Sequence, residues 1–148
     1  MTYELMENEH LIEVKKLQQE WQAENITYGV VAGTINQISE AMTPYCLIAK
    51  DGDKIIGYLM AELRSDNEYC IFPNGVSFID VTDLFVTEQY RSRGIGKELL
   101  VQCERMARDN GTKHVLLSSA TKDAETIRRF YTSNGYTIWT TQFYKNIE

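Results

Sequence analysis

The sequence predicts a single mixed α/β (α+β) domain whose sheet begins antiparallel and ends with a parallel crossover. Two observations predict this class. The strand-like segments 45–50 and 54–63 flank Asp51-Gly52-Asp53, which has the composition of a β-hairpin turn. Further along, the strand-like segments 76–86 and 114–119 are separated by a helical pattern, as in a βαβ unit.

The other elements have local signals of their own. Over residues 9–24, apolar side chains recur every three to four positions, which predicts a helix. Thr34 is a good N-cap for a short second helix, and Pro44 ends it. Later helices are expected at 95–110 and 123–134, closed by Gly111 and Gly135, and further strands at 3–5 and over the aromatic segment 136–147.

The chain of 148 residues is long enough for one domain, residues 1–148, to fold without a disulfide or a metal. Its three cysteines, Cys46, Cys70 and Cys103, are widely spaced and form no CxxC pair. We therefore expect neither a disulfide framework nor a zinc site. Cys103 falls on the apolar face of the predicted helix 95–110 and is expected in the core.

Charge and hydropathy exclude several function classes. Residues 1–74 carry five Lys and Arg against twelve Asp and Glu, a net charge of −7, which disfavours nucleic acid as a partner. No apolar stretch approaches the ~20 residues of a membrane helix. The acidic N-terminus has no apolar signal-peptide segment. We therefore expect a cytoplasmic protein with no nucleic-acid or membrane partner.

The segment 83–97 carries the most informative pattern. A long strand ends at Val86 and, after a turn, a helix opens at Gly94 and Gly96. The unpaired N–H groups and the dipole of a helix start attract anions, and glycines let phosphates approach the backbone closely. Positive charge is added there by three basic residues, Arg91, Arg93 and Lys97. The segment therefore predicts a pyrophosphate-binding loop.

Two familiar phosphate-binding motifs do not fit this loop. A P-loop is excluded because Glu98 follows Gly96-Lys97 and position 91 is not glycine. The dinucleotide fingerprint is excluded because Leu99 stands where its third glycine is required. A nucleotide-binding domain such as a kinase is therefore disfavoured.

The run Arg91-Ser92-Arg93-Gly94-Ile95-Gly96 is similar to the Q/R-x-x-G-x-G/A motif of the GNAT family of N-acetyltransferases. Phe130-Tyr131 followed by Asn134-Gly135-Tyr136 resembles the same family's FYxxxGF/Y segment, and the element order resembles it over essentially the whole chain. The resemblance implies a three-layer GNAT-type acyltransferase fold. It also implies a sheet splayed between the strands 76–86 and 114–119, with acetyl-CoA in the opening and an amine as acceptor.

The resemblance further implies how acetyl-CoA is held, without a metal. The loop would bind the pyrophosphate, and the strand end would pair with the pantetheine amides like an added strand. The residues so implied are Leu84, Phe85, Val86, Arg91, Ser92, Arg93, Gly94, Ile95, Gly96 and Lys97. One departure is Ala124, where many relatives have an Asn that contacts pantetheine; Asp123 beside it is a helix cap. The strand end 83–86 and the short C-terminal tail also resemble, more loosely, the aminoglycoside 3-N-acetyltransferases.

Transfer to an amine requires a base, because an alkylamine of pKa about 10.4 is almost wholly protonated at pH 7. A carboxylate in a partly dry cleft can accept that proton. Asp80, by its spacing from Arg91, matches the family's general-base glutamate and is the first candidate. Asp83 is the second candidate, and water alone is the third. Strict alternation places these two side chains on opposite faces of the strand, but a β-bulge would change that register.

Departure of the CoA thiolate is helped by an acid. Tyr131 resembles the family's general acid, and a phenol of pKa about 10 stays protonated at neutral pH. The alternative is that Tyr131 is only a core aromatic. A backbone N–H at Phe85 or Val86 is expected to stabilise the oxyanion.

The predicted C-terminal strand places aromatic side chains on both of its faces: Tyr136, Trp139, Phe143 and Tyr144. One face would cover the core, and the other face would pack against a second copy of the chain, so we expect a homodimer. The leading function is acetyl-CoA-dependent N-acetyl transfer to an amine of a small molecule or peptide. Two alternatives stay open: a non-catalytic CoA-binding regulatory domain of the same fold, and an acyltransferase for longer acyl groups.

Overall fold

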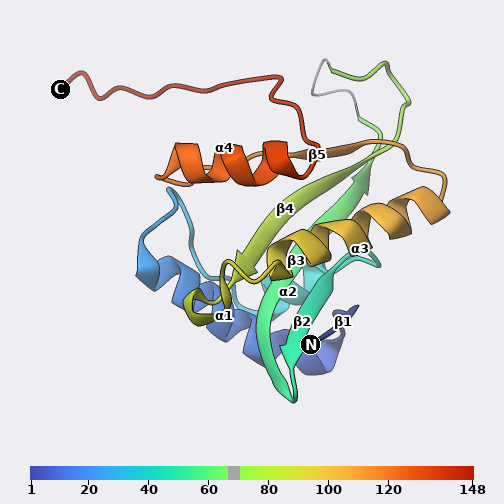
Figure 1. The fold of residues 1–148 in the computed structure, drawn as a ribbon, viewed down its shortest axis with the longest axis vertical. Helices are drawn as coiled ribbons and strands as arrows, with labels where there is room; N and C mark the ends of the chain where they lie inside the picture. Colours follow the sequence, from blue (N-terminus) through green and yellow to red (C-terminus); the bar gives the residue numbers. More distant parts are fainter. Residues whose placement is uncertain (67–70) are drawn as a thin grey trace.

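A computed structural model describes residues 1–66 and 71–148 of the chain (Figure 1). Its centre is a sheet of five strands in the order β1-β2-β3-β4-β5. The strands are β1 (Thr2–Leu5), β2 (Leu47–Asp51), β3 (Lys54–Arg64), β4 (Phe78–Val86) and β5 (Val115–Leu117). The first three junctions are antiparallel and the β4–β5 junction is parallel, as the sequence predicts.

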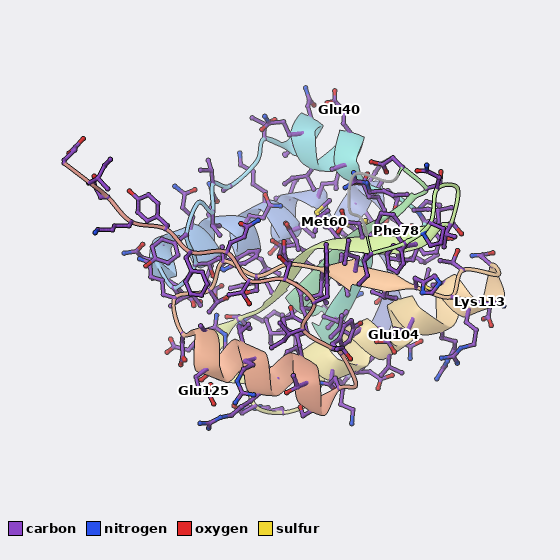
Figure 2. All side chains as sticks on the ribbon, turned by 90° about the horizontal axis from the view of Figure 1, so that it is seen from above. Glu40, Met60, Phe78, Glu104, Lys113 and Glu125 are labelled. Carbon is purple, nitrogen blue, oxygen red and sulfur yellow. The ribbon has the colours of Figure 1, made fainter. Side chains whose placement is uncertain are left out.

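Helices cover both faces of this sheet, which makes three layers. They are α1 (Leu11–Glu24), α2 (Ile35–Ala41), α3 (Ile95–Asp109) and α4 (Ala124–Ser133), with short 3-10 turns η1 (Asn8–His10) and η2 (Glu88–Tyr90). Figure 2 shows α2, marked by Glu40, on one side of the sheet and the helices of Glu104 and Glu125 on the other. The expected three-layer fold is confirmed.

Local signals in the sequence set most element boundaries. The Thr34 hydroxyl accepts a hydrogen bond from the Gln37 N–H, and the Gln37 side chain accepts one from the Thr34 N–H, so both residues cap α2. The Asp123 carboxylate caps α4 by accepting from the Thr126 N–H. These are the caps expected from the sequence.

Two apolar clusters hold the layers together. On one face, Leu99 and Cys103 of α3 are buried against sheet residues such as Leu59. On the other face, Val14 of α1 and Ile38 of α2 are buried against the sheet. The helical periodicities read from the sequence therefore mark the buried sides of α1 and α3, and Cys103 is a core residue as expected.

Strand β4 carries one residue more than its partner β3 at a single point. Met60 lies opposite Asp83, and the next residue of β3, Ala61, lies opposite Val81, so Thr82 has no register partner. This is the arrangement of a β-bulge. The Thr82 hydroxyl donates to the Met60 carbonyl at 3.3 Å, which ties the extra residue to β3.

The bulge changes which face each β4 side chain occupies. Val81 before the bulge and Leu84 after it both pack in the α3 cluster, so the alternation skips Thr82. Asp80 and Asp83 therefore lie on the same face, that of α1. The expectation from strict alternation, which puts them on opposite faces, is wrong because the extra residue reverses the alternation.

Strands β4 and β5 separate after a short parallel ladder. The pairing covers Ile79↔Val115, Asp80↔Leu116 and Val81↔Leu117, and β5 ends there. The chain after β5 instead crosses to the α1–α2 connection, where Thr121 forms an isolated antiparallel bridge with Thr27. The expected splay of the central sheet is thus present beside residues 82–86.

The C-terminal segment is not the strand that its composition predicts. Residues 136–148 contain no strand, and Figure 1 shows the chain leaving the body after α4 as an extended tail. Phe143 and Tyr144 are 93% and 89% exposed, so these aromatic rings cover no core within the chain. The alternating aromatics suit a sheet surface, but a strand requires a neighbouring strand to accept its backbone hydrogen bonds.

Cys70 and part of the expected loop 64–75 lie outside the described residues. Within the described part of the chain, no helix is both long and apolar enough to cross a membrane.

Candidate active site

The expected phosphate loop lies between the end of β4 and the start of α3. Gly94 is the N-cap of α3 and has φ +80°, a left-handed conformation that side chains with a Cβ rarely adopt. No atom lies within 4 Å of the position that a Gly94 Cβ would occupy, so the space beside the loop is open. The first amides of α3 have no acceptors within the helix and are available to an anion.

Gly96 is the second residue of α3 and faces Phe130 of α4. A Cβ there would lie 3.4 Å from Phe130 Cζ, and 3.9 Å from Val86 Cγ2. Gly96 therefore lets the first turn of α3 lie close to both β4 and the aromatic pair of α4. The two sequence motifs, one in α3 and one in α4, meet at this point.

The three basic residues of the loop differ in their surroundings. Arg91 Nε donates to the Val86 carbonyl at 2.8 Å, and Arg91 Nη2 donates to the two Glu24 oxygens at 2.8 and 2.6 Å. Arg93 is exposed, with Nη2 donating to the Gln89 carbonyl and the guanidinium over the Tyr90 ring. Lys97 is exposed on the first turn of α3. Ser92 between the two arginines has φ +61°.

The edge of β4 beyond the splay faces the opening. The Thr87 N–H donates to the Ile56 carbonyl in β3 at 2.9 Å. The N–H groups of successive strand residues point alternately to the two sides of the strand. The Phe85 N–H therefore points toward β3, and the N–H groups of Leu84 and Val86 point into the opening. Of the two oxyanion donors expected from the sequence, Val86 has the required direction.

Asp80 lies in an ion pair away from the opening. Its Oδ2 accepts from Arg64 Nη1 at 2.8 Å, and Arg64 also binds Asp66 at 2.6 Å. The Asp80 side chain is 15% exposed and lines neither of the clefts described below. The Asp80 carboxylate is thus occupied by Arg64 and does not face an acceptor in either cleft.

Asp83 lies in a different setting, between β4 and α1. Its Oδ2 accepts from the Tyr58 hydroxyl at 3.3 Å and from Gln18 Nε2 at 3.5 Å. Burial raises the pKa of the Asp83 carboxyl above its ordinary value, and these two hydrogen bonds oppose that shift. Gln18 in turn accepts from the Gly33 N–H at 2.9 Å, which links Asp83 to the α1–α2 connection.

Tyr131 lies on the inner face of α4. Its ring meets Phe130 and Tyr136 edge to face, with centroids 5.0 and 5.7 Å away. Burial raises the pKa of the Tyr131 phenol to about 12, so it is protonated throughout the neutral range. Tyr131 is thus both packed against the α3 cluster and part of a cleft wall.

Two clefts converge on Asp83. The first, of about 340 Å³, lies in the splay and is lined by β4, the segment after β5, and Tyr131 of α4. The second, of about 350 Å³, lies under α2 and the α1–α2 connection. Both clefts include Gln18, Val31, Thr82 and Asp83 in their walls, so one carboxylate is reached from two sides.

Sequence reasoning missed Gln18 and Tyr58, which hold the Asp83 carboxylate. Gln18 stands within an amphipathic helix, and Tyr58 stands in a run of apolar strand residues. The only available signal was a polar side chain among residues that otherwise form a core. Within the described residues, no group of three or more His, Cys, Asp or Glu side chains is placed to hold a metal ion.

The family model of the acetyltransferase (GNAT) domain matches residues 43–138, more than half of the chain. The matched region begins before β2 and ends after the aromatic segment of α4, so it contains the splay, the loop and Asp83. No curated protein sequence matches the chain.

Solved structures of similar fold cover nearly the whole chain at low sequence identity. The tetramutant of the BH1408 protein from Bacillus halodurans has a TM-score of 0.81 and 16% identity, covering 99% of this chain and 100% of that one. Aminoglycoside N-acetyltransferase AAC(6')-Iy in complex with CoA has a TM-score of 0.77 and 18% identity, and the match covers 99% of this chain and 94% of that one. Aminoglycoside acetyltransferase meta-AAC0020, from an uncultured soil metagenomic sample, was solved in complex with trehalose. It has a TM-score of 0.74 and 17% identity, and the match covers 99% of this chain and 96% of that one.

Proposed function

Because the chain belongs to the GNAT family of acetyltransferases and is an N-acetyltransferase, we propose that it transfers the acetyl group of acetyl-CoA to an amine of a small molecule or peptide. Both substrates would be bound together, and the amine would attack the thioester directly. The observation that carries this proposal is the convergence of two clefts on Asp83, one of which reaches the splay and Tyr131.

The loop and the β4 edge fit a CoA thioester. Open space at Gly94, the exposed amides of the α3 N-terminus, and the exposed Arg93 and Lys97 suit a pyrophosphate. The outward N–H groups of Leu84 and Val86 suit the amide chain of pantetheine, which would extend the sheet at the splay. Acetyl-CoA supplies the activated acyl group, and the protein supplies position and proton transfer.

Asp83 acts as the base in this proposal. Burial raises its pKa, so its ionised form is a stronger proton acceptor than an exposed carboxylate. Asp83 takes the proton that frees the lone pair of the acceptor nitrogen, which then forms its bond to the acyl carbon. Asp80, the first candidate from the sequence, has a structural role instead, since its carboxylate is bound by Arg64.

Tyr131 acts as the acid in this proposal. The carbon–sulfur bond breaks as the thiolate leaves, and the phenol proton of Tyr131 goes to that sulfur. The Val86 N–H, directed into the opening, would stabilise the negative charge on the acyl oxygen. The ammonium form of the acceptor loses two protons in becoming the amide. One goes to Asp83 and from there to solvent, and the second, released after the carbon–nitrogen bond forms, restores through solvent the proton that Tyr131 gives to the thiolate.

An amine panel tests this function. Purified protein is incubated with acetyl-CoA and single amines, and acetylated products are detected by mass spectrometry alongside thiol release. We expect at least one primary amine to be acetylated, and Asp83→Asn to abolish most of that turnover. Tight CoA binding with no product from any amine would instead identify a non-catalytic CoA-binding domain. Product only from longer acyl-CoA donors would identify a different acyltransferase.

A further inference from the structure

The walls of the two clefts carry a single formal charge. Among the described residues that line either cleft, Asp83 is the only one with a charged side chain. The polar groups beside it are neutral hydroxyls and amides, such as those of Thr82 and Gln18. Among the described residues, an acceptor that reaches Asp83 from either side therefore meets one carboxylate in the cleft walls.

The second cleft adds an apolar wall to this charge. It is lined by Met60 of β3, by Ile38 and Ala41 of α2, and by Val31 and Ala32 of the α1–α2 connection. Gln37 is its other amide besides Gln18. A substrate in this cleft would place carbon atoms, rather than further charged groups, against the protein.

Three carboxylates of α1 and α2 are engaged or directed elsewhere. Glu24 at the end of α1 is bound by Arg91, and the Glu20 carboxylate accepts from the Thr87 hydroxyl. Glu40 of α2 points away from the sheet, as Figure 2 shows. None of these three lines a cleft, so none can pair with a second ammonium group of an acceptor in the clefts.

We infer that the acceptor carries one ammonium group on an uncharged, apolar stem, and that it enters through the second cleft with its nitrogen at Asp83. This inference rests on the proposed function and narrows its substrate class. A polyamine or an aminoglycoside would have to bring further ammonium groups into a cleft without partners for them. Removing a charged group from water without a partner is unfavourable, so such acceptors are selected against.

The same chemistry occurs in two sources. A free alkylamine has one ammonium on an apolar stem, and so does a lysine side chain in a peptide of otherwise neutral residues. Four probes cover the choices: n-butylamine, Nα-acetyl-lysine methylamide, spermidine and the aminoglycoside sisomicin. The first two present one cation on a four-carbon stem, and the last two present several cations.

Initial rates of thiol release with acetyl-CoA are measured for each probe at one pH. We expect kcat/KM for n-butylamine or the lysine derivative to exceed that for spermidine and sisomicin by about tenfold or more, the effect of one unpaired charge. A preference for n-butylamine would assign a free amine, and a preference for the lysine derivative would assign a peptide. A higher kcat/KM for spermidine or sisomicin would overturn the inference.

A variant of the cleft wall tests the cause. Gln37→Glu adds a carboxylate to the second cleft and keeps the side-chain oxygen that caps α2. Asn36→Asp adds the same charge to the same helix at a residue that lines neither cleft. We expect Gln37→Glu to raise the spermidine to n-butylamine ratio of kcat/KM by about threefold or more, and Asn36→Asp to leave it unchanged. Equal ratios in both variants would place the acceptor outside this cleft.

Binding separates failure of the inference from failure of the proposed function. Titration calorimetry with n-butylamine and with spermidine, in the presence of CoA, needs no turnover. Stronger binding of n-butylamine without turnover would support the inferred cleft and contradict the proposed transferase activity. Stronger binding of spermidine would overturn the inference even if acetylation occurs. Absence of binding and turnover for n-butylamine and the lysine derivative would overturn it as well.

Discussion

Arg91 joins the cofactor loop to the end of α1 through Glu24. Its Nη2 donates to both Glu24 oxygens while its Nε donates to the carbonyl of Val86, the last residue of β4. The guanidinium also lies over the Phe85 ring, 5.4 Å from the centroid. The charge of Arg91 is thus already paired within the protein. In the proposed site, Arg91 would contribute to anion binding by holding the loop in place between β4 and α1.

Arg91→Lys should weaken CoA binding although it keeps the positive charge. A single ammonium cannot bind the Val86 carbonyl and Glu24 at once, so the loop loses one of its anchors. We expect a loss of about tenfold in affinity by calorimetry, the effect of one hydrogen bond to a charged group.

Glu24→Gln is the informative partner of that variant. This substitution removes a negative charge near the loop, and by electrostatics alone that removal would strengthen the binding of the CoA pyrophosphate. If Arg91 acts by position, Glu24→Gln should instead weaken CoA binding. Tighter binding in Glu24→Gln would show that the Arg91–Glu24 pair competes with the cofactor.

Gly94→Val should obstruct the cofactor loop. The backbone at φ +80° is strained for any β-branched residue, and the new methyl groups would occupy the open space beside the α3 amides. We expect CoA affinity to fall by at least tenfold, the loss of about one charge-assisted hydrogen bond. Gly75→Val is the matched control, because Gly75 has φ +81°, open space and no place in the loop. Equal CoA affinity in both variants would remove the loop from the site.

Asp83→Asn should lower kcat/KM by about 10²–10⁴-fold at neutral pH, the usual contribution of a positioned base. The loss should shrink at high pH, where more of the amine is already unprotonated. In the native protein the acidic limb of the pH profile should lie above the ordinary carboxyl range, since burial raises the Asp83 pKa. Asp80→Asn is the control and should retain most activity. Activity lost in Asp80→Asn and kept in Asp83→Asn would return the base to Asp80.

The same substitution should stabilise the fold near neutral pH. Because the folded-state pKa of Asp83 is raised above its unfolded value, its protonated form favours folding at low pH, and that contribution is lost as pH rises through the folded pKa. Asn carries no charge at any pH and can still accept from Tyr58 and Gln18. The melting temperature of Asp83→Asn should therefore exceed that of the native protein at pH 7, and the two should converge toward pH 3. A lower melting temperature at pH 7 would contradict the burial of this charge.

Tyr131→Phe should lower kcat and leave CoA affinity nearly unchanged. In the proposed mechanism the hydroxyl acts on the leaving sulfur, whereas the ring supplies the packing against Phe130 and Tyr136, which Phe preserves. We expect a loss of about 10²-fold or more in kcat. With a phenol pKa of about 12, the native rate should show no loss of this acid below pH 10. An unchanged kcat would reduce Tyr131 to a core aromatic.

Removal of residues 138–148 should change the assembly state. The tail leaves Trp139, Phe143 and Tyr144 exposed, and a second copy that covered these aromatic rings would remove their apolar surface from water. We expect a dimer mass for the full chain by light scattering at micromolar concentration and a monomer mass for the truncated chain. A monomer mass for the full chain would contradict the proposed homodimer.

Local chemistry made much of this fold predictable. A hairpin turn at Gly52, an N-cap at Thr34 and the apolar stripe of α3 are each written within a few neighbouring residues. The loop at Gly94 was predictable for the same reason, because helix start, glycine and basic side chains are adjacent in the chain. Each feature depends on short-range backbone geometry, which sequence patterns record well.

Features that depend on pairing between distant segments could not be predicted from local patterns, and the splay was expected from the family resemblance alone. The bulge at Thr82 exists only relative to β3, and it decides which face Asp83 occupies. The hydrogen bonds from Gln18 and Tyr58 to Asp83 join residues 65 and 25 positions apart. The strand expected at 136–147 was wrong for a related reason. Alternating side chains indicate which residues of a strand would share a face, but not whether a neighbouring strand is present to pair with it.

The parting of β4 from β5 also divides the molecule by local stability. Residues 79–81 of β4 pair with β5 in three register pairs, and after Val81 the two strands share no hydrogen-bonded ladder. Segments joined by few backbone bonds open more readily than the whole domain unfolds. Amide hydrogens in β5 and α4 should therefore exchange faster than those in β3. A ligand that contacts both β4 and the β5–α4 segment would slow that exchange, because it links the two segments. Its binding would therefore make the unfolding of the domain more cooperative.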